Sequence, residues 1–291
     1  MVRGNATSSE EIQIVDTHVH LFPAKDIGKR VLEQIKETFG VPYYCTGSPE
    51  ELAETMKESG ISYAVVMNQA AANKEAMNWL ISGNFFVCAY SRKRPELIPA
   101  IGLDKGMKRN PTEEVEHKLK WGVRAVKLHP VAQEFYVNDR AMWPIYQKCE
   151  EKNLPIIFHC GKMMVEGLPD YAHPELFYEV IRAFPKIRVI LAHMGGGFWE
   201  EAIKLANNFP ENVYFDTSIA ISAAPIPDFI RLTDEQAIEM IGKIGAHRVM
   251  FGSDFPWINP KLDIERIKGL GLTESEKIMI LSENARKLFN I

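Results

Sequence analysis

Short runs of apolar, mostly β-branched residues alternate with amphipathic stretches along the whole chain. Most of these runs are continuously apolar, which is typical of strands in a parallel sheet that helices cover. In the stretches between them, apolar residues recur three or four positions apart, as on the core-facing side of a helix. We therefore expect eight strands, at Ile12–Val19, Tyr63–Met67, Leu97–Leu103, Val123–Leu128, Pro155–His159, Arg188–His193, Val213–Thr217 and Val249–Ser253.

Signals for helix starts stand in the intervening stretches. Ser48 is followed by Pro49 and, three positions on, by Glu51, which is the pattern of a capping box with proline in the first turn. Thr273 and Glu276 repeat the capping-box spacing before the last amphipathic stretch. The chain is thus expected to alternate strand and helix from one end to the other.

This alternation predicts an α/β fold, either a closed barrel or an open doubly wound sheet. No glycine-rich dinucleotide fingerprint follows an early strand, and Gly195–Gly197 after the sixth is explained as well by a plain turn. No linker or repeat divides the chain, and Ala223–Asp228 is expected to be a long active-site loop. A barrel needs about 250 residues. We expect a single (β/α)8 TIM-barrel domain over residues 1–291.

Composition narrows the class of protein. With 46% hydrophobic and 25% charged residues, a large core is available and disorder is excluded. The net charge is −4 and no basic patch is interleaved with aromatic residues, so we expect no nucleic-acid partner. No apolar run approaches the roughly 18 residues of a membrane span, so we expect no membrane partner. A small molecule is the expected substrate; a homodimer is compatible with the sequence, which leaves the oligomeric state open.

The expected location is the cytoplasm. The first eleven residues are polar and include Glu10 and Glu11, so they lack the apolar core of a signal peptide. The four cysteines are scattered without CxxC spacing, which indicates free thiols in a reducing compartment.

Residues of the types that bind metal ions stand where several expected strands end. His18 and His20 end the first strand and point to one face of it, because side chains alternate with period two. His159, His193 and Asp254 end the fifth, sixth and eighth strands. TIM-barrel enzymes place their active sites at the C-terminal ends of the strands. We expect these five side chains to meet there.

Each of these residues taken alone has an ordinary structural explanation. A single histidine at a strand end is often only hydrogen-bonded, and an aspartate before a helix is often an N-cap. The joint pattern carries more weight, because five of the eight histidines fall at strand ends: His18, His20, His129, His159 and His193. The pattern favours a metal site.

The residues in this order resemble a known family. Asp16–His20 reads DTHVH, His159 and His193 follow on strands five and six, and Ser253–Pro256 lies within GSDFP on strand eight. This arrangement resembles the amidohydrolase superfamily, and within it the amidohydrolase-related (amidohydrolase 2) branch that includes the aminocarboxymuconate-semialdehyde decarboxylase-like metal-dependent hydrolases. The resemblance runs over nearly the whole chain.

The resemblance implies a role for each matching residue. His18, His20 and His159 match neutral imidazole ligands of a divalent ion, expected to be Zn2+. Asp254 matches the aspartate that binds the metal and handles the proton of its bound water, whose pKa zinc lowers to about 7. His193 is expected to act as a base, to polarise the substrate or to bind a second metal. One ion is the default expectation; a second ion, or Mn2+ in its place, stays open.

The fourth strand is ambiguous. Lys127 and His129 both have the parity to face the barrel interior. In two-metal members of the superfamily a carboxylated lysine or a glutamate on this strand bridges the ions. We favour a substrate contact or an ion pair for Lys127, and His129 is balanced between site and structure. Arg124 and Trp257 are further candidates for substrate contact, with a surface ion pair and core packing as the respective alternatives.

Two reaction classes fit such a site. In a hydrolase, metal-bound water attacks an amide, ester or lactone carbonyl of a small molecule. In a decarboxylase, the ion orients an aromatic or unsaturated carboxylic acid, and His193 or Asp254 protonates carbon. The chain shows no obvious insertion to enclose an aromatic acid, which favours the hydrolase. A barrel kept only for binding would have lost a ligand position, and all of them are filled.

Overall fold

A computed structural model describes residues 12–68, 74–162 and 167–291. In this part of the chain eight strands form one sheet, in which neighbours are parallel and follow the order of the sequence. The strands are β1 (Ile14–His20), β2 (Ile61–Met67), β3 (Leu97–Gly102), β4 (Ala125–Leu128), β5 (Ile156–Phe158), β6 (Val189–Leu191), β7 (Val213–Asp216) and β8 (Val249–Met250).

The sheet closes through the segment that follows β8. Thr17 N–H donates to the Phe251 carbonyl oxygen at 2.9 Å, and Asp254 N–H donates to the His18 carbonyl oxygen at 3.0 Å. His20 N–H donates to the carbonyl oxygen of Phe255 at 2.7 Å. These bonds bring the last strand back to the first, and the predicted (β/α)8 barrel is confirmed.

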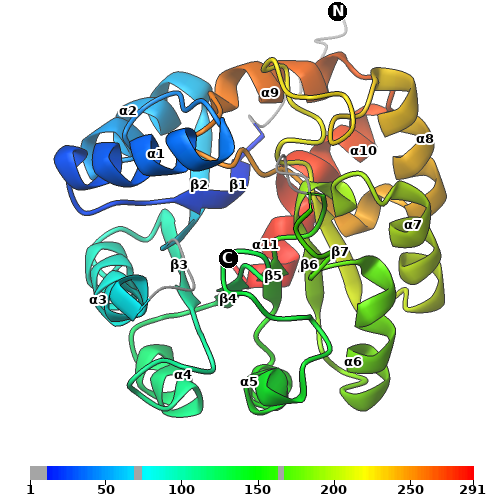
Figure 1. Ribbon diagram of the computed structural model, residues 1–291. Helices are drawn as coiled ribbons and strands as arrows, with labels where there is room; N and C mark the ends of the chain where they lie inside the picture. Colours follow the sequence, from blue (N-terminus) through cyan, green and yellow to red (C-terminus); the bar gives the residue numbers. More distant parts are fainter. Residues whose placement is uncertain (1–11, 69–73, 163–166) are drawn as a thin grey trace, which may run out of the picture.

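Helices surround the strands (Figure 1). They are α1 (Lys25–Phe39), α2 (Pro49–Ser59), α3 (Lys74–Ser91), α4 (Pro111–Leu119), α5 (Trp143–Glu151), α6 (Phe177–Ala183), α7 (Trp199–Asn208), α8 (Asp234–Ile244), α9 (Pro260–Gly269), α10 (Glu274–Ile278) and α11 (Asn284–Phe289). Short 3-10 helices are η1 (Arg140–Met142), η2 (Pro174–Leu176), η3 (Ala192–Gly195) and η4 (Ala246–Arg248), and η5 (Met279–Glu283) is a π-helix between α10 and α11. The capping boxes predicted at Ser48 and Thr273 are both present, at the starts of α2 and α10.

One end of the barrel interior is filled by apolar side chains. Ala125, Ile157 and Ile190 lie on the inner face and pack in one buried cluster with Ala285, Leu288 and Phe289 of α11. In Figure 1, α11 lies over the middle of the barrel. Because α11 closes the amino-terminal end of the barrel, a site of polar side chains can form only at the opposite, carboxyl end of the strands.

Several strands are shorter than their apolar runs predict. The sixth and eighth end at Leu191 and Met250, so His193 lies in η3 and Asp254 lies in the loop beyond β8. His159 likewise follows β5, and only His18 and His20 lie within a strand. His193 and Asp254 both have a φ of 61°, which a strand cannot contain. The main chain therefore leaves the sheet before it reaches these two residues.

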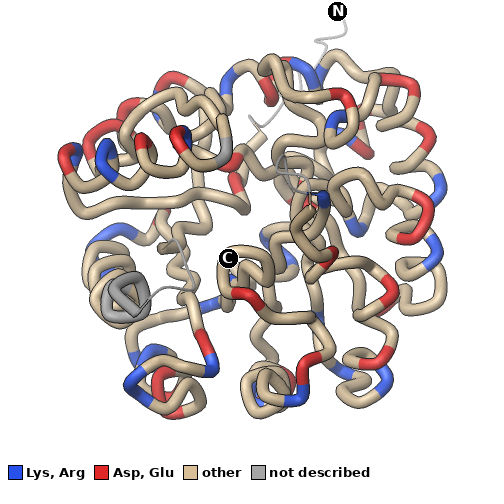
Figure 2. Tube along the Cα trace, viewed as in Figure 1, with Lys and Arg blue, Asp and Glu red and all other residues tan. Residues whose placement is uncertain are grey.

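The outer surface carries mixed charge. Figure 2 shows Lys and Arg interspersed with Asp and Glu over the surrounding helices, in keeping with the small net charge. Across the described residues, no helix combines the length and apolar character needed to cross a membrane.

Candidate active site

Three donor atoms converge at the carboxyl end of β1. His18 Nε2 lies 3.2 Å from His20 Nε2. Asp254 Oδ1 lies 3.3 Å from His18 Nε2 and 3.4 Å from His20 Nε2. All three side chains are buried. The structure thus brings together three of the residues that the sequence singles out.

The spacing of these atoms fits a divalent metal ion. Zinc bound tetrahedrally at 2.0–2.1 Å from its ligands places neighbouring ligand atoms about 3.3 Å apart. The three distances within the His18–His20–Asp254 group lie between 3.2 and 3.4 Å. Two imidazole nitrogens and a carboxylate oxygen are also ligands that zinc and manganese accept. The residues present therefore fit the metal that the resemblance implies.

Asp216, at the end of β7, is a site residue that the sequence reasoning missed. Its Oδ2 lies 2.9 Å from His18 Nδ1, and it is 1% exposed. Burial acts to raise the pKa of Asp216, but the neighbouring His18 outweighs it and lowers the pKa to about 2. The signal was a polar triplet, Asp216 to Ser218, at the end of an apolar strand.

His193 is held by the same carboxylate. Its main-chain N–H donates to Asp216 Oδ1 at 3.0 Å. Its Nδ1 lies 2.8 Å from Ser218 Oγ and 3.2 Å from the Ser218 carbonyl oxygen. Together with His18 and Asp216, His193 forms a second group of donor atoms within metal-binding distance of one another.

His159 lies beside the His18–His20–Asp254 group and outside both clusters of donor atoms. Its Nδ1 lies 3.0 Å from His193 Nε2, and its ring stacks on that of His129 with centroids 4.0 Å apart. His129 Nδ1 accepts a hydrogen bond from Ala132 N–H at 3.1 Å, which gives it a structural function in the turn after β4. That His129 and His159 bind a metal ion stays a prediction.

Lys127 reaches the same place from β4. Its side chain is 2% exposed, and its Nζ lies 2.9 Å from His18 Nε2. Burial lowers the pKa of Lys127 to about 8, although Asp254 and Asp216 act against this. The amine therefore contacts a nitrogen that a metal ion would also use.

Burial keeps four of the site imidazoles neutral. It lowers the pKa of His20 and that of His193 to about 4, and those of His129 and His159 well below the usual value. Burial acts to raise the pKa of Asp254, but the histidines around it hold that pKa far below its usual range. Neutral imidazoles and an ionised carboxylate are the forms that bind metal ions.

The surroundings differ in what they add. Asp16 accepts hydrogen bonds from Ser253 N–H at 3.0 Å and from Ser253 Oγ at 2.5 Å, and so ties β1 to the loop that carries Asp254. The Trp257 ring meets His20 edge-on at 5.1 Å and forms a wall beside the site. Arg124 is exposed at the start of β4, at the other end of the barrel, and takes no part.

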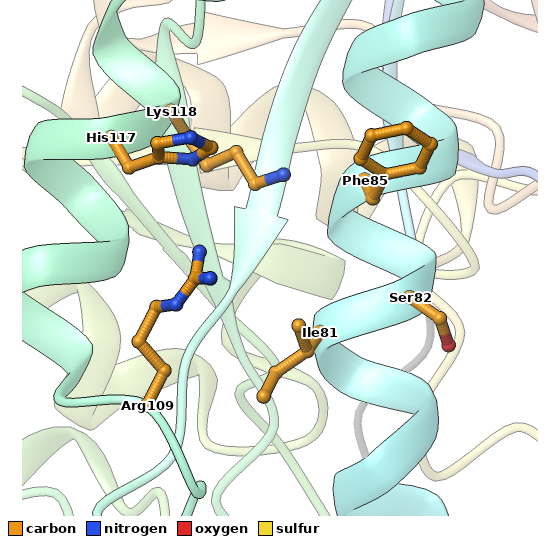
Figure 3. Close-up of a pocket in the computed structure, with 6 residues that line it drawn as sticks. All are labelled: Ile81, Ser82, Phe85, Arg109, His117 and Lys118. Carbon is orange, nitrogen blue, oxygen red and sulfur yellow. The ribbon is translucent and has the colours of Figure 1, made fainter.

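A separate hollow of about 420 Å³ lies between α3 and α4 on the outside of the barrel (Figure 3). Arg109 and Lys118 project into it from one side and Phe85 from the other. The buried carboxylate of Glu114 pairs with Arg109 at 2.8 Å and with Lys118 at 3.8 Å. None of the predicted site residues lines this hollow.

The family of the chain can now be stated. A family model described as amidohydrolase (Amidohydro_2) matches residues 15–291. Because the match covers nearly the whole chain, the protein belongs to this amidohydrolase family. The resemblance drawn from the strand-end residues is confirmed.

Individual relatives are distant. Gamma-resorcylate decarboxylase from Rhizobium radiobacter is 24% identical over 179 residues, which are 56% of this chain and 48% of that protein. The matches thus span about half the length of the curated relatives. Among solved structures, an uncharacterised TIM-barrel protein from Bordetella bronchiseptica has a TM-score of 0.76 at 23% identity, covering 95% of this chain and 98% of that one.

A second solved structure carries a ligand. Dihydroxybenzoic acid decarboxylase from Polaromonas sp. JS666, solved with bound manganese and the inhibitor 2-nitroresorcinol, has a TM-score of 0.73 at 17% identity. The match covers 96% of this chain and 97% of that chain. At such identities the likeness demonstrates the fold alone.

Proposed function

We propose that this protein is a metal-dependent, non-oxidative decarboxylase of an aromatic or unsaturated carboxylic acid. The observation that carries the proposal is the His18–His20–Asp254 donor set in a family whose matched relatives include gamma-resorcylate and dihydroxybenzoic acid decarboxylases. These relatives favour decarboxylation. The sequence alone favoured hydrolysis.

His18, His20 and Asp254 would hold the ion, with His159 as the further ligand that the family pattern implies. When bound, a divalent ion supplies positive charge that orients and polarises an acidic substrate. Both Zn2+ and Mn2+ accept these ligands, and manganese is the ion in the Polaromonas enzyme. Lys127 adds a buried amine, which suits a substrate that carries negative charge.

In such a reaction the bond between the carboxyl carbon and its neighbour breaks, carbon dioxide leaves, and a proton takes its place on the same carbon. We assign the transfer of this proton to Asp254 and His193, both buried: one of them takes up a proton from solvent and gives it to the carbon that keeps the electron pair of the broken bond, which returns the group to its starting state. Burial keeps bulk water away from these groups and strengthens their electrostatic effect on the substrate. Trp257, against His20, is placed to contact a flat ring.

The test is product analysis with the full chain. Protein loaded with Mn2+ or Zn2+ is given gamma-resorcylate and other dihydroxybenzoates, and carbon dioxide and the decarboxylated product are measured. A panel of esters, lactones and amides is run beside it. We expect carbon dioxide release that disappears in Asp254→Asn and in metal-stripped protein. Turnover of the esters, lactones or amides alone would contradict the proposal and support a hydrolase. His247→Ala, at an exposed position, serves as the control variant.

A further inference from the structure

We propose that the end of β7, through Asp216 and Ser218, fixes the hydrogen positions on three site histidines so that two of them, His18 and His159, present an Nε2 lone pair to the site. The histidines are His18, His193 and His159. The inference rests on the proposed metal site and adds positioning residues to it that the family pattern did not supply. The proposal is carried by hydrogen-bond distances among buried and partly buried side chains.

The first branch runs from Asp216 to His18. An ionised carboxylate can only accept hydrogen bonds, so the 2.9 Å contact with Asp216 Oδ2 requires a hydrogen on His18 Nδ1. A neutral imidazole then carries its lone pair on Nε2. The Lys127 amine, 2.9 Å from Nε2, supports this independently, because a lysine ammonium can only donate.

The second branch runs from Ser218 to His193. The carbonyl oxygen of Ser218 can only accept, so its 3.2 Å contact requires a hydrogen on His193 Nδ1. The Ser218 hydroxyl donates to Asp216 Oδ1, which leaves its own oxygen to accept from the same Nδ1 at 2.8 Å. His193 therefore carries its lone pair on Nε2.

The second branch continues to His159. His193 Nε2 lies 3.0 Å from His159 Nδ1, and only one of these two nitrogens can carry the shared hydrogen. Because His193 Nε2 holds a lone pair, the hydrogen lies on His159 Nδ1, and His159 Nε2 is left as the second lone pair. Within the described residues, that buried atom has no hydrogen-bond partner. A buried acceptor of this kind is costly unless a ligand uses it.

Asp216 joins the two branches, because Oδ2 contacts His18 while Oδ1 receives the Ser218 hydroxyl and the His193 main-chain N–H. A metal-binding histidine is generally oriented by a hydrogen bond from its other ring nitrogen. Here a single buried carboxylate would orient His18 of β1 directly and, through Ser218 and His193 of η3, also His159 just after β5. Asp216 and Ser218 are thus positioning residues that need not touch the substrate.

The hydrogen positions can be read directly in the metal-free protein. Long-range ¹H–¹⁵N correlation spectra of histidine-labelled protein distinguish a hydrogen on Nδ1 from one on Nε2. We expect hydrogen on Nδ1 for His18, His193 and His159. A hydrogen on Nε2 of any one of them in the wild-type protein would overturn the proposal, and this reading does not depend on a variant folding.

Two variants separate the branches. In Asp216→Asn the carboxylate that fixes His18 is lost, so His18 should lose its preference for Nδ1–H, and the affinity for Mn2+ should fall about 10- to 100-fold. In His193→Phe, His159 loses the nitrogen that accepts its hydrogen, so His159 should lose its preference for Nδ1–H. His18, which Asp216 still contacts, should keep its own preference for Nδ1–H. An unchanged His18 spectrum and metal affinity in Asp216→Asn would contradict the proposal.

A matched control distinguishes positioning from general destabilisation. Glu114 is a buried carboxylate of α4, outside the site and facing α3, so Glu114→Gln should lower stability without changing the histidine spectra. Metal affinity is measured by competition with a chelator. If the wild-type protein binds no divalent ion but shows the expected hydrogens, the proposed function fails while the hydrogen arrangement stands.

Discussion

His193 and Asp254 both hold their main chain in the left-handed region, with φ values of 61°. This conformation costs a residue other than glycine about 1–3 kcal/mol, and it persists only where the surroundings enforce it. Here the enforcement comes from Asp216, which binds His193 N–H, and from His18, whose carbonyl oxygen receives Asp254 N–H. The strain therefore coincides with the two residues to which we assign proton transfer.

Replacing His20 with Ala removes one of the three converging donors. We expect the affinity for a divalent ion to fall more than about 100-fold, since loss of an outer partner alone costs 10- to 100-fold. Metal content after dialysis, measured by mass spectrometry, checks this. The exposed His247→Ala should keep its metal, and full metal content in His20→Ala would show that the ion binds elsewhere or not at all.

Lys127→Met tests what the buried amine does. In the structure the amine contacts the Nε2 lone pair of His18, which a metal ion would use. Removing that hydrogen bond, at about 1 kcal/mol, should tighten metal binding roughly fivefold while the methionine keeps the space filled. Chelator competition measures the change. A carboxylated Lys127 that binds a second ion would give the opposite result, weaker binding and a lower metal content.

At the scale of elements, the turns after β5 and β6 touch through two glycines. A Cβ on Gly161 would lie 2.6 Å from Gly196 Cα and 2.7 Å from its carbonyl oxygen, and the φ of Gly161 is 134°. Lys162 N–H also donates to the Gly196 carbonyl oxygen at 2.8 Å. This close approach sets the separation of His159 and His193.

Gly161→Ala should therefore destabilise the protein by about 2–3 kcal/mol, because main chain rather than a flexible side chain stands in the way. Thermal or urea unfolding measures the loss. Gly60→Ala is the matched control: Gly60 also has a left-handed φ, of 68°, but nothing lies within 4 Å of its added Cβ. Equal losses in both variants would mean that the close approach contributes nothing.

At the scale of the whole molecule, a buried carboxyl group links stability to pH. Asp263 of α9 accepts hydrogen bonds from Ser222 Oγ at 2.9 Å and Ala223 N–H at 2.8 Å, and so fastens the loop after β7. Its Oδ2 is buried without a hydrogen-bond partner among the described residues. Burial, the largest cause, raises the pKa of Asp263 to about 7.

The folded state thus binds this proton more tightly than the unfolded state. The stabilisation from Asp263 is fully present below pH 4 and is lost as the pH rises through about 7. The loss is on the order of 4 kcal/mol at most. Urea unfolding from pH 4 to 8 measures it as the difference between the wild type and Asp263→Asn, whose curve should be flatter. If the free energy of unfolding varied with pH in the same way in both proteins, the raised pKa of Asp263 would be contradicted.

The architecture of this protein follows from local patterns in its sequence. The alternation of apolar runs and amphipathic stretches is a local property, and so are the caps at Ser48 and Thr273; both can be predicted without any long-range contact. Eight such units in sequence order leave few topologies, and the barrel follows. His18, His20 and Asp254 could be placed at one end, because all parallel strands present their carboxyl ends there.

The contacts between the site side chains, by contrast, depend on long-range packing. His18 and Asp216 are 198 positions apart, and their contact depends on the closure of the barrel and on the χ angles of both residues, which no periodicity encodes. The same holds for the Ser218 hydroxyl, for the Lys127 amine beside His18, and for His159 lying outside the converging group. Residue type and strand position determine which chemistry is available, whereas ångström-scale distances between distant strands determine which groups share a proton or a metal ion.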